Sequence, residues 1–400
     1  MALQEGIWQA IEEALSAGDS ARCQDLVRSA LRLHPNEPML WVWMTRAQRM
    51  GGQFEEAVGS AEHALECVQS ADAVRPGLEL ELAFTCFEWA RGCGEPRLFD
   101  RAKVHLQRVL ASDPAPVLWE SASVVLAACD NRLGDPDRAI SRYRTILSRN
   151  PHNEDALYNL AVLLDRRAPA EAEQLLRTVC RLDPAHAGGA ASVALCEELC
   201  LGDRCHEAEA VARAFFAAAP NDHRAMTLLA DTIAPYKPQE AIELLQTVLA
   251  EEPASWRALQ TLGGLRLCLG ETQAAERLLR RAVECGAMNA FVVEMLVKLL
   301  SREHRLDEAL EIALLFRSKR PDLESSHEIL ARVYLMNQDL EPALQESTKA
   351  VEIDPVDPDC LLTHASVLVK MGDAVRAEAI AKRLEGVAPE YSAKLRKLLG

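Results

Sequence analysis

The spacing of alanines and prolines limits, more than any other feature, how this chain can fold. Eight times an alanine is followed twelve residues later by a proline, and the pairs recur along most of the chain. A period near 34 residues is typical of stacked helical hairpins, in which each hairpin covers the apolar face of the next. The sequence therefore predicts an all-α solenoid. The pairs are Ala102/Pro114, Ala139/Pro151, Ala172/Pro184, Ala208/Pro220, Ala241/Pro253, Ala309/Pro321, Ala343/Pro355 and Ala377/Pro389.

The stretch 126–151 shows how one repeat is built. Apolar residues at helical spacing end before Gly134, since glycine tolerates the positive φ of a helix C-cap. Asp135 and Pro136 then begin a second helix, as a capping carboxylate and a proline at the first helical position. Ala139 follows one turn later, where a small side chain allows two antiparallel helices to approach closely.

These units resemble the tetratricopeptide repeat. In that family the first helix carries a large residue, a Leu-Gly or Leu-Ala pair and another large residue, and the second helix carries small residues and ends at an Asp-Pro pair. The resemblance covers residues 4 to 389, about eleven units, and implies a right-handed superhelical α-solenoid of stacked antiparallel helix pairs. Matching first-helix sets are Leu157, Leu160-Ala161 and Leu164; Met226, Leu229-Ala230 and Ile233; Leu259, Leu262-Gly263 and Arg266; and His327, Leu330-Ala331 and Tyr334. Second-helix matches are Ala343, Ala350 and Asp354-Pro355, and Ala57, Ala61 and Ala64.

We expect one continuous array over residues 1–389, followed by a C-terminal capping helix over 390–400. Its amphipathic pattern places Leu395, Leu398 and Leu399 on one face, as the end of a solenoid requires. The expected units are 4–35, 38–70, 74–114, 118–151, 153–184, 186–220, 223–253, 256–287, 290–321, 324–355 and 358–389.

The third unit is longer than the others. Ala57 and Ala102 are 45 residues apart, which places about eleven extra residues between Cys67 and Arg97. We expect a helix from about Leu78 to Ala90 and a wide turn at Gly92, Gly94 and Pro96. The extra length has two interpretations: a longer hairpin without a function of its own, or an edge specific to one partner.

Composition narrows the classes of ligand. The chain has 49% hydrophobic and 26% charged residues, with a formal net charge of −16. That charge, without a Lys/Arg-rich run, argues against nucleic acid or an anionic membrane as the main ligand. Apolar stretches are too short for a membrane span, and acidic residues interrupt the first fifteen residues, unlike a signal peptide. Twelve cysteines dispersed along the chain favour a reducing compartment, and we expect the cytoplasm.

Motifs for catalysis or cofactor binding are absent from the sequence: it contains no GxxxxGK[ST], GxGxxG, GxSxG or HExxH. We therefore expect no enzyme activity, no cofactor and no metal. One cluster, formed by Cys196, Cys200, Cys205 and His206, has metal-ligand chemistry, but the usual CxxC knuckle is missing, which favours buried cysteines acting as small hydrophobes. The histidines His152, His186 and His223 follow unit-closing prolines and are predicted to be exposed loop residues.

The resemblance implies that first helices line a concave groove in which extended peptides bind. Projecting each first helix by its period of 3.6 predicts a groove face enriched in positive charge. Arginine forms bidentate hydrogen bonds with carboxylates, so the face suits an acidic or C-terminal segment of a partner. The alternative is pairing with nearby Asp155, Asp165, Asp231 and Glu294. The predicted partner-binding residues are Trp43, Arg46, Arg49, Arg132, Tyr158, Asn159, Arg166, Arg224, Arg257, Gln260, Lys298, Arg302, Arg332 and Lys370.

The sequence does not match the specialised chaperone-binding members of the family. The carboxylate clamp of chaperone-binding members retains only Asn159 here, with Ala190 and Ala194 where basic residues belong. Trp41 is expected in the core, and Trp43 is expected to be free near Arg46, as a binding hot spot.

We expect a non-catalytic scaffold or adaptor that binds a protein or peptide. The alternatives are a regulatory or substrate-recruiting subunit of an enzyme complex, and self-association into homo-oligomers.

Overall fold

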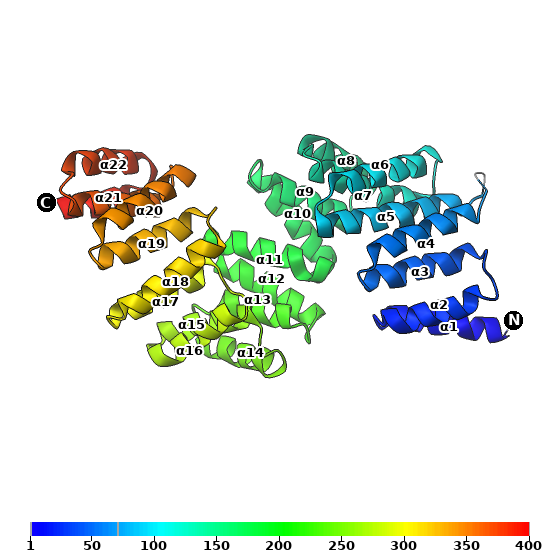
Figure 1. Cartoon of the computed structure of the whole chain (residues 1–400), viewed down its shortest axis with the longest axis horizontal. Coiled ribbons are helices and arrows are strands. Elements are labelled where there is room, and N and C mark those ends of the chain that lie inside the picture. Colours follow the sequence, from blue (N-terminus) through cyan, green and yellow to red (C-terminus); the bar gives the residue numbers. More distant parts are fainter. Residues whose placement is uncertain (1, 70–71, 400) are drawn as a thin grey trace. The chain divides into compact units, whose positions relative to one another are not determined.

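The computed structural model describes residues 2–69 and 72–399, which form 23 α-helices and no strand. Figure 1 shows these helices as a succession of hairpins, α1 to α23. They group into two compact units, residues 1–198 and 199–400. In both units the predicted all-α fold of stacked helix pairs is confirmed.

The first unit contains α1 (Ala2–Ser16), α2 (Ser20–Leu31), α3 (Pro38–Met50), α4 (Phe54–Glu66), α5 (Arg75–Cys93), α6 (Pro96–Ala111), α7 (Pro116–Arg132), α8 (Pro136–Arg149), α9 (Glu154–Leu164), α10 (Pro169–Leu182) and most of α11 (His186–Leu201). The second contains α12 (Cys205–Ala218), α13 (His223–Ile233), α14 (Pro238–Glu251), α15 (Trp256–Cys268), α16 (Thr272–Glu284), α17 (Ala290–Arg302), α18 (Leu306–Lys319), α19 (Glu324–Met336), α20 (Leu340–Ile353), α21 (Pro358–Lys370), α22 (Ala374–Val387) and α23 (Pro389–Leu399).

The repeated alanines lie where two helices of a hairpin meet. All eight alanines of the Ala–Pro spacing are fully buried, and Cys23, which takes the same place in the first hairpin, is also fully buried. Larger buried side chains such as Tyr143, Phe215 and Phe316 fill the space beside them. The small side chains set the distance between helices, and the large ones supply the apolar area that stabilises the stack.

The long third hairpin is longer because of its helices. Helix α5 has 19 residues and α6 has 16, and the connection between them is short. Gly94 ends α5 in the left-handed conformation, with φ at 74°, and α6 begins at Pro96. The prediction of a wide turn here is wrong, because the extra residues extend the helices instead.

Salt bridges connect consecutive second helices at equivalent positions. An arginine five residues after the buried alanine of one hairpin pairs with a glutamate one residue before the buried alanine of the next. Each such exposed pair contributes little stability alone, but the repetition keeps neighbouring hairpins in register. The pairs are Arg144–Glu171 at 3.0 Å, Arg213–Glu240 at 2.9 Å and Arg280–Glu308 at 2.6 Å.

Helix α23 covers the last apolar surface, but with fewer leucines than expected. Leu395 is fully buried against Leu361 and Leu384. Leu398 is 56% exposed, so the prediction that it shares the buried face is wrong, and the side chain of Leu399 lies outside the described residues. Across residues 2–69 and 72–399, the helices are too short or too polar to cross a membrane.

Candidate functional site

The first helices of the first unit carry arginines that are already paired. The Arg46 Nη2 atom lies 2.9 Å from Glu81 Oε2, and the Arg49 Nη1 atom lies 3.0 Å from Glu81 Oε1. Arg49 also donates to Thr85 and lies over the ring of Phe84, 4.8 Å from its centroid. One carboxylate on α5 therefore holds both cations of α3.

The same intramolecular pairing occurs in the second unit. Arg224 of α13 lies 2.9 Å from Asp222, the residue that directly precedes this helix. Glu294 on α17 accepts from Lys298 at 2.7 Å and lies 3.5 Å from Arg332 on α19. Although burial opposes ionisation of Glu294, these two cations hold the pKa of its carboxyl below its ordinary value. At these positions the structure supports the alternative of pairing with neighbouring acids.

The two predicted amide side chains also bond within the chain. Asn159 donates to the backbone oxygen of Asp155, four residues earlier on α9. Gln260 accepts from Asn289 at 2.8 Å. Arg257 lies over the ring of Trp256, 5.1 Å from its centroid, and has no ion pair among the residues described.

Four predicted cations are exposed and make no ion pair, hydrogen bond or cation–π contact with any described residue. Arg132 and Arg166 belong to the first unit, and Arg302 and Lys370 to the second. Arg132, Arg302 and Lys370 lie in the last turns of their first helices, where the helix dipole favours positive charge. These four are the cations that remain available to a partner.

The prediction that Trp43 is free is wrong. Trp43 is only 5% exposed, and its ring packs edge-on against Trp8 of α1 with the centroids 4.5 Å apart. Trp41, expected in the core, is partly buried and donates from Nε1 to the backbone oxygen of Pro35 at 2.8 Å. Helix α1 covers the side of α3 on which Trp43 lies, so this ring contributes to packing rather than to a surface.

The three histidines predicted in exposed loops differ in exposure. His152 is exposed as expected, whereas His186 and His223 are partly buried. His223 begins α13, and His186 is the first residue of α11, directly before the left-handed residues Ala187, Gly188 and Gly189 that interrupt this helix. His223 lies 2.9 Å from Glu251 and 3.0 Å from Glu252, and hydrogen bonds to these carboxylates raise the pKa of its imidazole.

His186 belongs to a small cluster of possible metal ligands. One ligand atom from each of Glu154, Asp183 and His186 lies within 4.8 Å of the others. The imidazole is 3.3 Å from Glu154 and 3.4 Å from Asp155. Tyr158 packs near this imidazole, with ring centroids 6.3 Å apart. Three ligands are one fewer than a structural zinc site uses.

The cysteine cluster found in the sequence consists of thiols in different environments. Cys196 is buried, Cys200 is exposed and Cys205 is intermediate, and none of the three forms a disulfide. Burial raises the pKa of the Cys200 thiol, and the neighbouring Cys205 raises it further. A raised pKa disfavours the thiolate form that binds metals. His206 instead packs near the ring of Tyr236, 5.8 Å between centroids.

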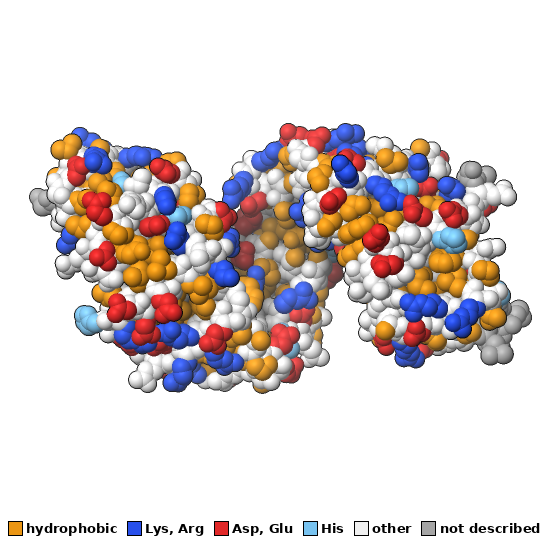
Figure 2. Space-filling view, viewed as in Figure 1, with side chains coloured by type: hydrophobic (Ala, Val, Ile, Leu, Met, Phe, Trp, Pro, Cys, Tyr) orange, Lys and Arg blue, Asp and Glu red, His pale blue; other side chains and the backbone are white. Residues whose placement is uncertain are grey.

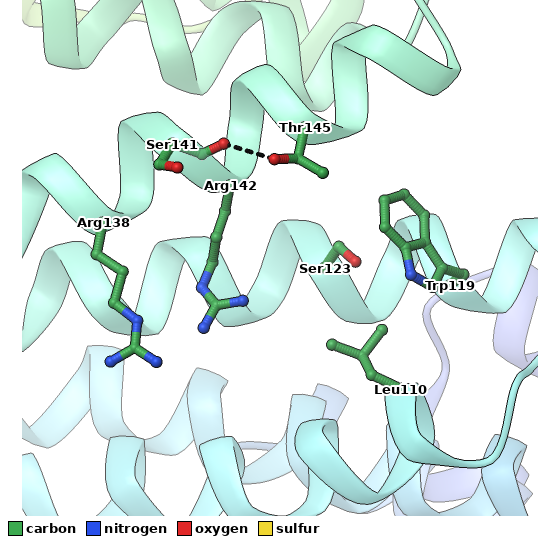
Figure 3. Close-up of a pocket in the computed structure, with 7 residues that line it drawn as sticks. All are labelled: Leu110, Trp119, Ser123, Arg138, Ser141, Arg142 and Thr145. Carbon is green, nitrogen blue, oxygen red and sulfur yellow. Dashed lines mark hydrogen bonds between the residues drawn. The ribbon is translucent and has the colours of Figure 1, made fainter.

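The sequence did not predict a pocket of about 390 Å³ in the first unit. Figure 3 shows its lining: Leu110 from α6, Trp119 and Ser123 from α7, and residues of α8. The α8 residues are Arg138, Ser141, Arg142 and Thr145. Three helices therefore form the pocket, with the arginines at one end and the apolar side chains at the other.

A buried carboxylate, that of Asp130, contacts the cations at the basic end of this pocket. Asp130 is fully buried, and its Oδ1 and Oδ2 atoms lie 2.7 Å from Lys103 and 2.6 Å from Arg142. Arg138 lies 3.5 Å from Oδ2. Although burial opposes ionisation of Asp130, Lys103 and Arg142 hold the pKa of its carboxyl below its ordinary value. Three cations surround one anion, so the pocket has a local excess of positive charge.

A second buried acid lies in the second unit. Glu328 is 5% exposed on α19, accepts from Thr363 of α21 at 2.7 Å and lies 3.6 Å from Arg332. Burial raises the pKa of this carboxyl, and the opposing effects of Arg332 and Thr363 do not cancel the shift. Glu328 therefore connects neighbouring first helices at a cost in desolvation.

Comparison with known proteins agrees with the helical hairpins. Residues 132–187 and residues 233–290 each match a family model described as tetratricopeptide repeat. No curated protein matches the sequence. The human IFIT1 dimer with m7Gppp-AAAA is 15% identical, with a TM-score of 0.51 over 88% of this chain and 90% of that chain. This likeness concerns the fold.

Two further solved structures are similar over almost the whole chain. Yeast Tom70 is 13% identical, with a TM-score of 0.49 over 98% of this chain and 91% of that chain. The Cut9 and Hcn1 hetero-tetramer of APC/C gives 12% identity and a TM-score of 0.45 over 98% and 96%. Matches to family models in both units, on a stack of hairpins with buried small residues at each crossing, identify the repeat. The chain contains tetratricopeptide repeats, which the family models match at residues 132–187 and 233–290.

Proposed function

We propose that this chain is a non-catalytic adaptor that binds an acidic segment of a partner protein on its first-helix surfaces. The tetratricopeptide-repeat fold is in general a scaffold for protein–protein interaction. The observation that carries the finer proposal is that Arg132, Arg166, Arg302 and Lys370 are exposed and unpaired within the described chain.

Unpaired cations matter because a new hydrogen bond from one of them to a carboxylate replaces no existing ion pair. At Arg46 or Arg49 an incoming acid would compete with Glu81. At Arg132 or Arg166 the incoming acid would form a charge-assisted hydrogen bond and displace only water. The remainder of the surface mixes both signs of charge, and Figure 2 shows basic and acidic side chains interspersed on the visible face.

The proposal names a protein partner and excludes nucleic acid as the main ligand. A net charge of −16 repels phosphate backbones over the surface as a whole. IFIT1, which shares the fold, is shown with m7Gppp-AAAA, and a ligand of that kind is not part of the proposal. We propose a cytoplasmic location, because none of its twelve cysteines forms a disulfide in the described chain.

Affinity capture from native cell extract at low and at moderate salt tests this proposal. The variant Arg132→Glu/Arg166→Glu is compared with the control Arg22→Glu/Arg97→Glu, which changes as many exposed arginines on second helices of the same unit. Loss of an acidic partner only in the first variant supports the proposal. Equal capture by both variants and the wild type refutes it for the first unit.

A separate variant, Arg302→Glu/Lys370→Glu, tests the second unit by the same assay. The capture also examines the alternative of a regulatory or substrate-recruiting subunit, since a catalytic chain would then be retained with the wild type in fixed proportion. Light scattering of the purified protein determines whether it forms homo-oligomers.

A further inference from the structure

We propose that the pocket between α6, α7 and α8 binds an oxyanion carried by a flat apolar group. The proposal concerns a different surface from the first-helix cations and does not depend on them. It rests on three features of the pocket: excess positive charge at one end, a hydroxyl without a protein partner in the middle and apolar side chains at the other end.

The basic end offers hydrogen-bond donors that the protein itself does not use. Arg142 contacts Asp130 through Nε alone, and its two Nη groups have no hydrogen-bond partner among the described residues. Arg138 is 51% exposed at its side chain and is 3.5 Å from the same carboxylate. A planar guanidinium with free Nη groups can hold a carboxylate or phosphate through two parallel bonds.

Acidic groups near the pocket are already engaged. Asp137 of α8 pairs with Arg167, and Glu120 of α7 accepts from Asn150 and Asn153 at 2.8 and 2.9 Å. Asp130 is the carboxylate that Lys103, Arg138 and Arg142 all contact. An anion in the pocket would give these three cations a second negative partner.

Ser123 is the second, independent indication of a ligand. Its side chain lines the pocket although the residue is only 6% exposed. Its hydroxyl makes no hydrogen bond to any residue in the described parts of the chain, so it is open to a polar group that enters the pocket. In Figure 3 Ser123 lies between the two arginines and Trp119, where a ligand that spans the pocket would pass.

The opposite end suits a flat apolar group. Trp119 and Leu110 lie together there, as Figure 3 shows. The guanidinium of Arg149 lies 4.0 Å from the centroid of the Trp119 ring and restrains it. A ring placed against Trp119 and Leu110 would bury apolar surface and direct an attached anion toward Arg142.

The pocket is large enough for one ring with one anionic group. A volume of about 390 Å³ is near the lower end of small-molecule sites. Two sources supply this chemistry: a free aryl phosphate or carboxylate, and a phosphotyrosine side chain of a partner protein. The shared group is an aromatic ring with an attached oxyanion.

Calorimetric titration of the full chain with phenyl phosphate, inorganic phosphate and phenol tests the pocket. We expect phenyl phosphate to bind at least about tenfold more tightly than either fragment, because only it contacts both ends. Ser123→Leu fills the pocket and should weaken phenyl phosphate by about tenfold or more. Ser121→Leu places the same residue on an exposed position of α7 and should change nothing.

Arg138→Gln provides a second variant that keeps the helix and the Arg142 contact. It should weaken phenyl phosphate about fivefold to tenfold while leaving phenol unchanged. The same affinity of phenyl phosphate for the wild type, Ser123→Leu and Arg138→Gln would overturn the proposal. A blocked phosphotyrosine peptide identifies the source: tighter binding than phenyl phosphate points to a partner protein, and equal or weaker binding points to a free ligand.

Discussion

Replacing Asp130 by asparagine separates the structural role of the buried carboxylate from its effect on the pocket. The substitution keeps the shape of the side chain and removes its charge. Lys103, Arg138 and Arg142 would then surround a neutral amide. We expect the first unit to lose stability while its affinity for anions rises.

The loss of stability follows from burial. Removing one partner of a buried ion pair costs about 3–5 kcal/mol when the other charge stays buried. Here the partners are not fully buried: the side chains of Lys103 and Arg142 are 20% and 26% exposed. They can turn toward water, so we expect a smaller cost of about 2 kcal/mol.

The gain in affinity follows from Coulomb's law. Two unit charges about 8 Å apart interact by about 0.5–2 kcal/mol for effective dielectric constants between about 80 and 20. Without the repulsion from Asp130, phenyl phosphate should therefore bind about 2-fold to 30-fold more tightly. A carboxylate that served only to hold the helices would, when removed, weaken binding together with stability.

Hydrogen exchange of the α7 and α8 amides measures the stability change, with the amides of α1 and α2 as an internal control. A local readout is needed because each hairpin of a solenoid contacts only its neighbours. Calorimetric titration of the same variant measures the affinity. Loss of both stability and anion affinity in Asp130→Asn would refute the reasoning, and so would exchange rates that stay unchanged in α7 and α8.

Three further substitutions test the packing and the buried charge. Phe316→Ala removes a fully buried ring and should cost about 3–5 kcal/mol; a smaller change than about 1 kcal/mol in urea unfolding would contradict the described core. Ala139→Leu at a fully buried crossing should cost about 1–3 kcal/mol through overpacking, measured by loss of helical circular dichroism on heating. For Glu328 burial raises the folded-state pKa above its unfolded value, so its stabilising contribution is present at low pH and lost as pH rises through the folded pKa. Glu328→Gln should therefore be more favourable relative to wild type at about pH 8 than at about pH 5, and an equal difference at both pH values in urea titrations would refute this.

The fold could be predicted because its determinants are local and repeated. Each hairpin needs a small residue where its helices cross and a signal that ends it, and both occur at fixed spacing in the sequence. Ala102 and Ala139 illustrate this: each is fully buried at the place that the period assigns to it. Where a local rule was interpreted too literally, as for Gly92 and Pro96, the length of a helix was mistaken for the width of a turn.

The surface could not be predicted equally well, because its charge depends on pairs that are distant in sequence. Arg46 and Glu81 are 35 residues apart, and helical periodicity gives the face of each residue but not its partner. Trp43 shows the same limit for packing, because a neighbouring helix covers it. The pocket required three helices, and its only sequence signal was the pair Arg138 and Arg142, spaced one helical turn apart.

The paired and unpaired cations have different consequences for recognition. At a paired arginine such as Arg49, a partner's carboxylate must displace Glu81, so one charge-assisted bond replaces another and the net gain is small. At an unpaired arginine such as Arg132 the bond is additional. Affinity for an acidic partner therefore depends on far fewer cations than the sequence contains, and its salt dependence should reflect only those few. Within the first unit, two surfaces meet this condition: the Arg132 and Arg166 positions, and the pocket in which Arg138 and Arg142 outnumber the charge of Asp130.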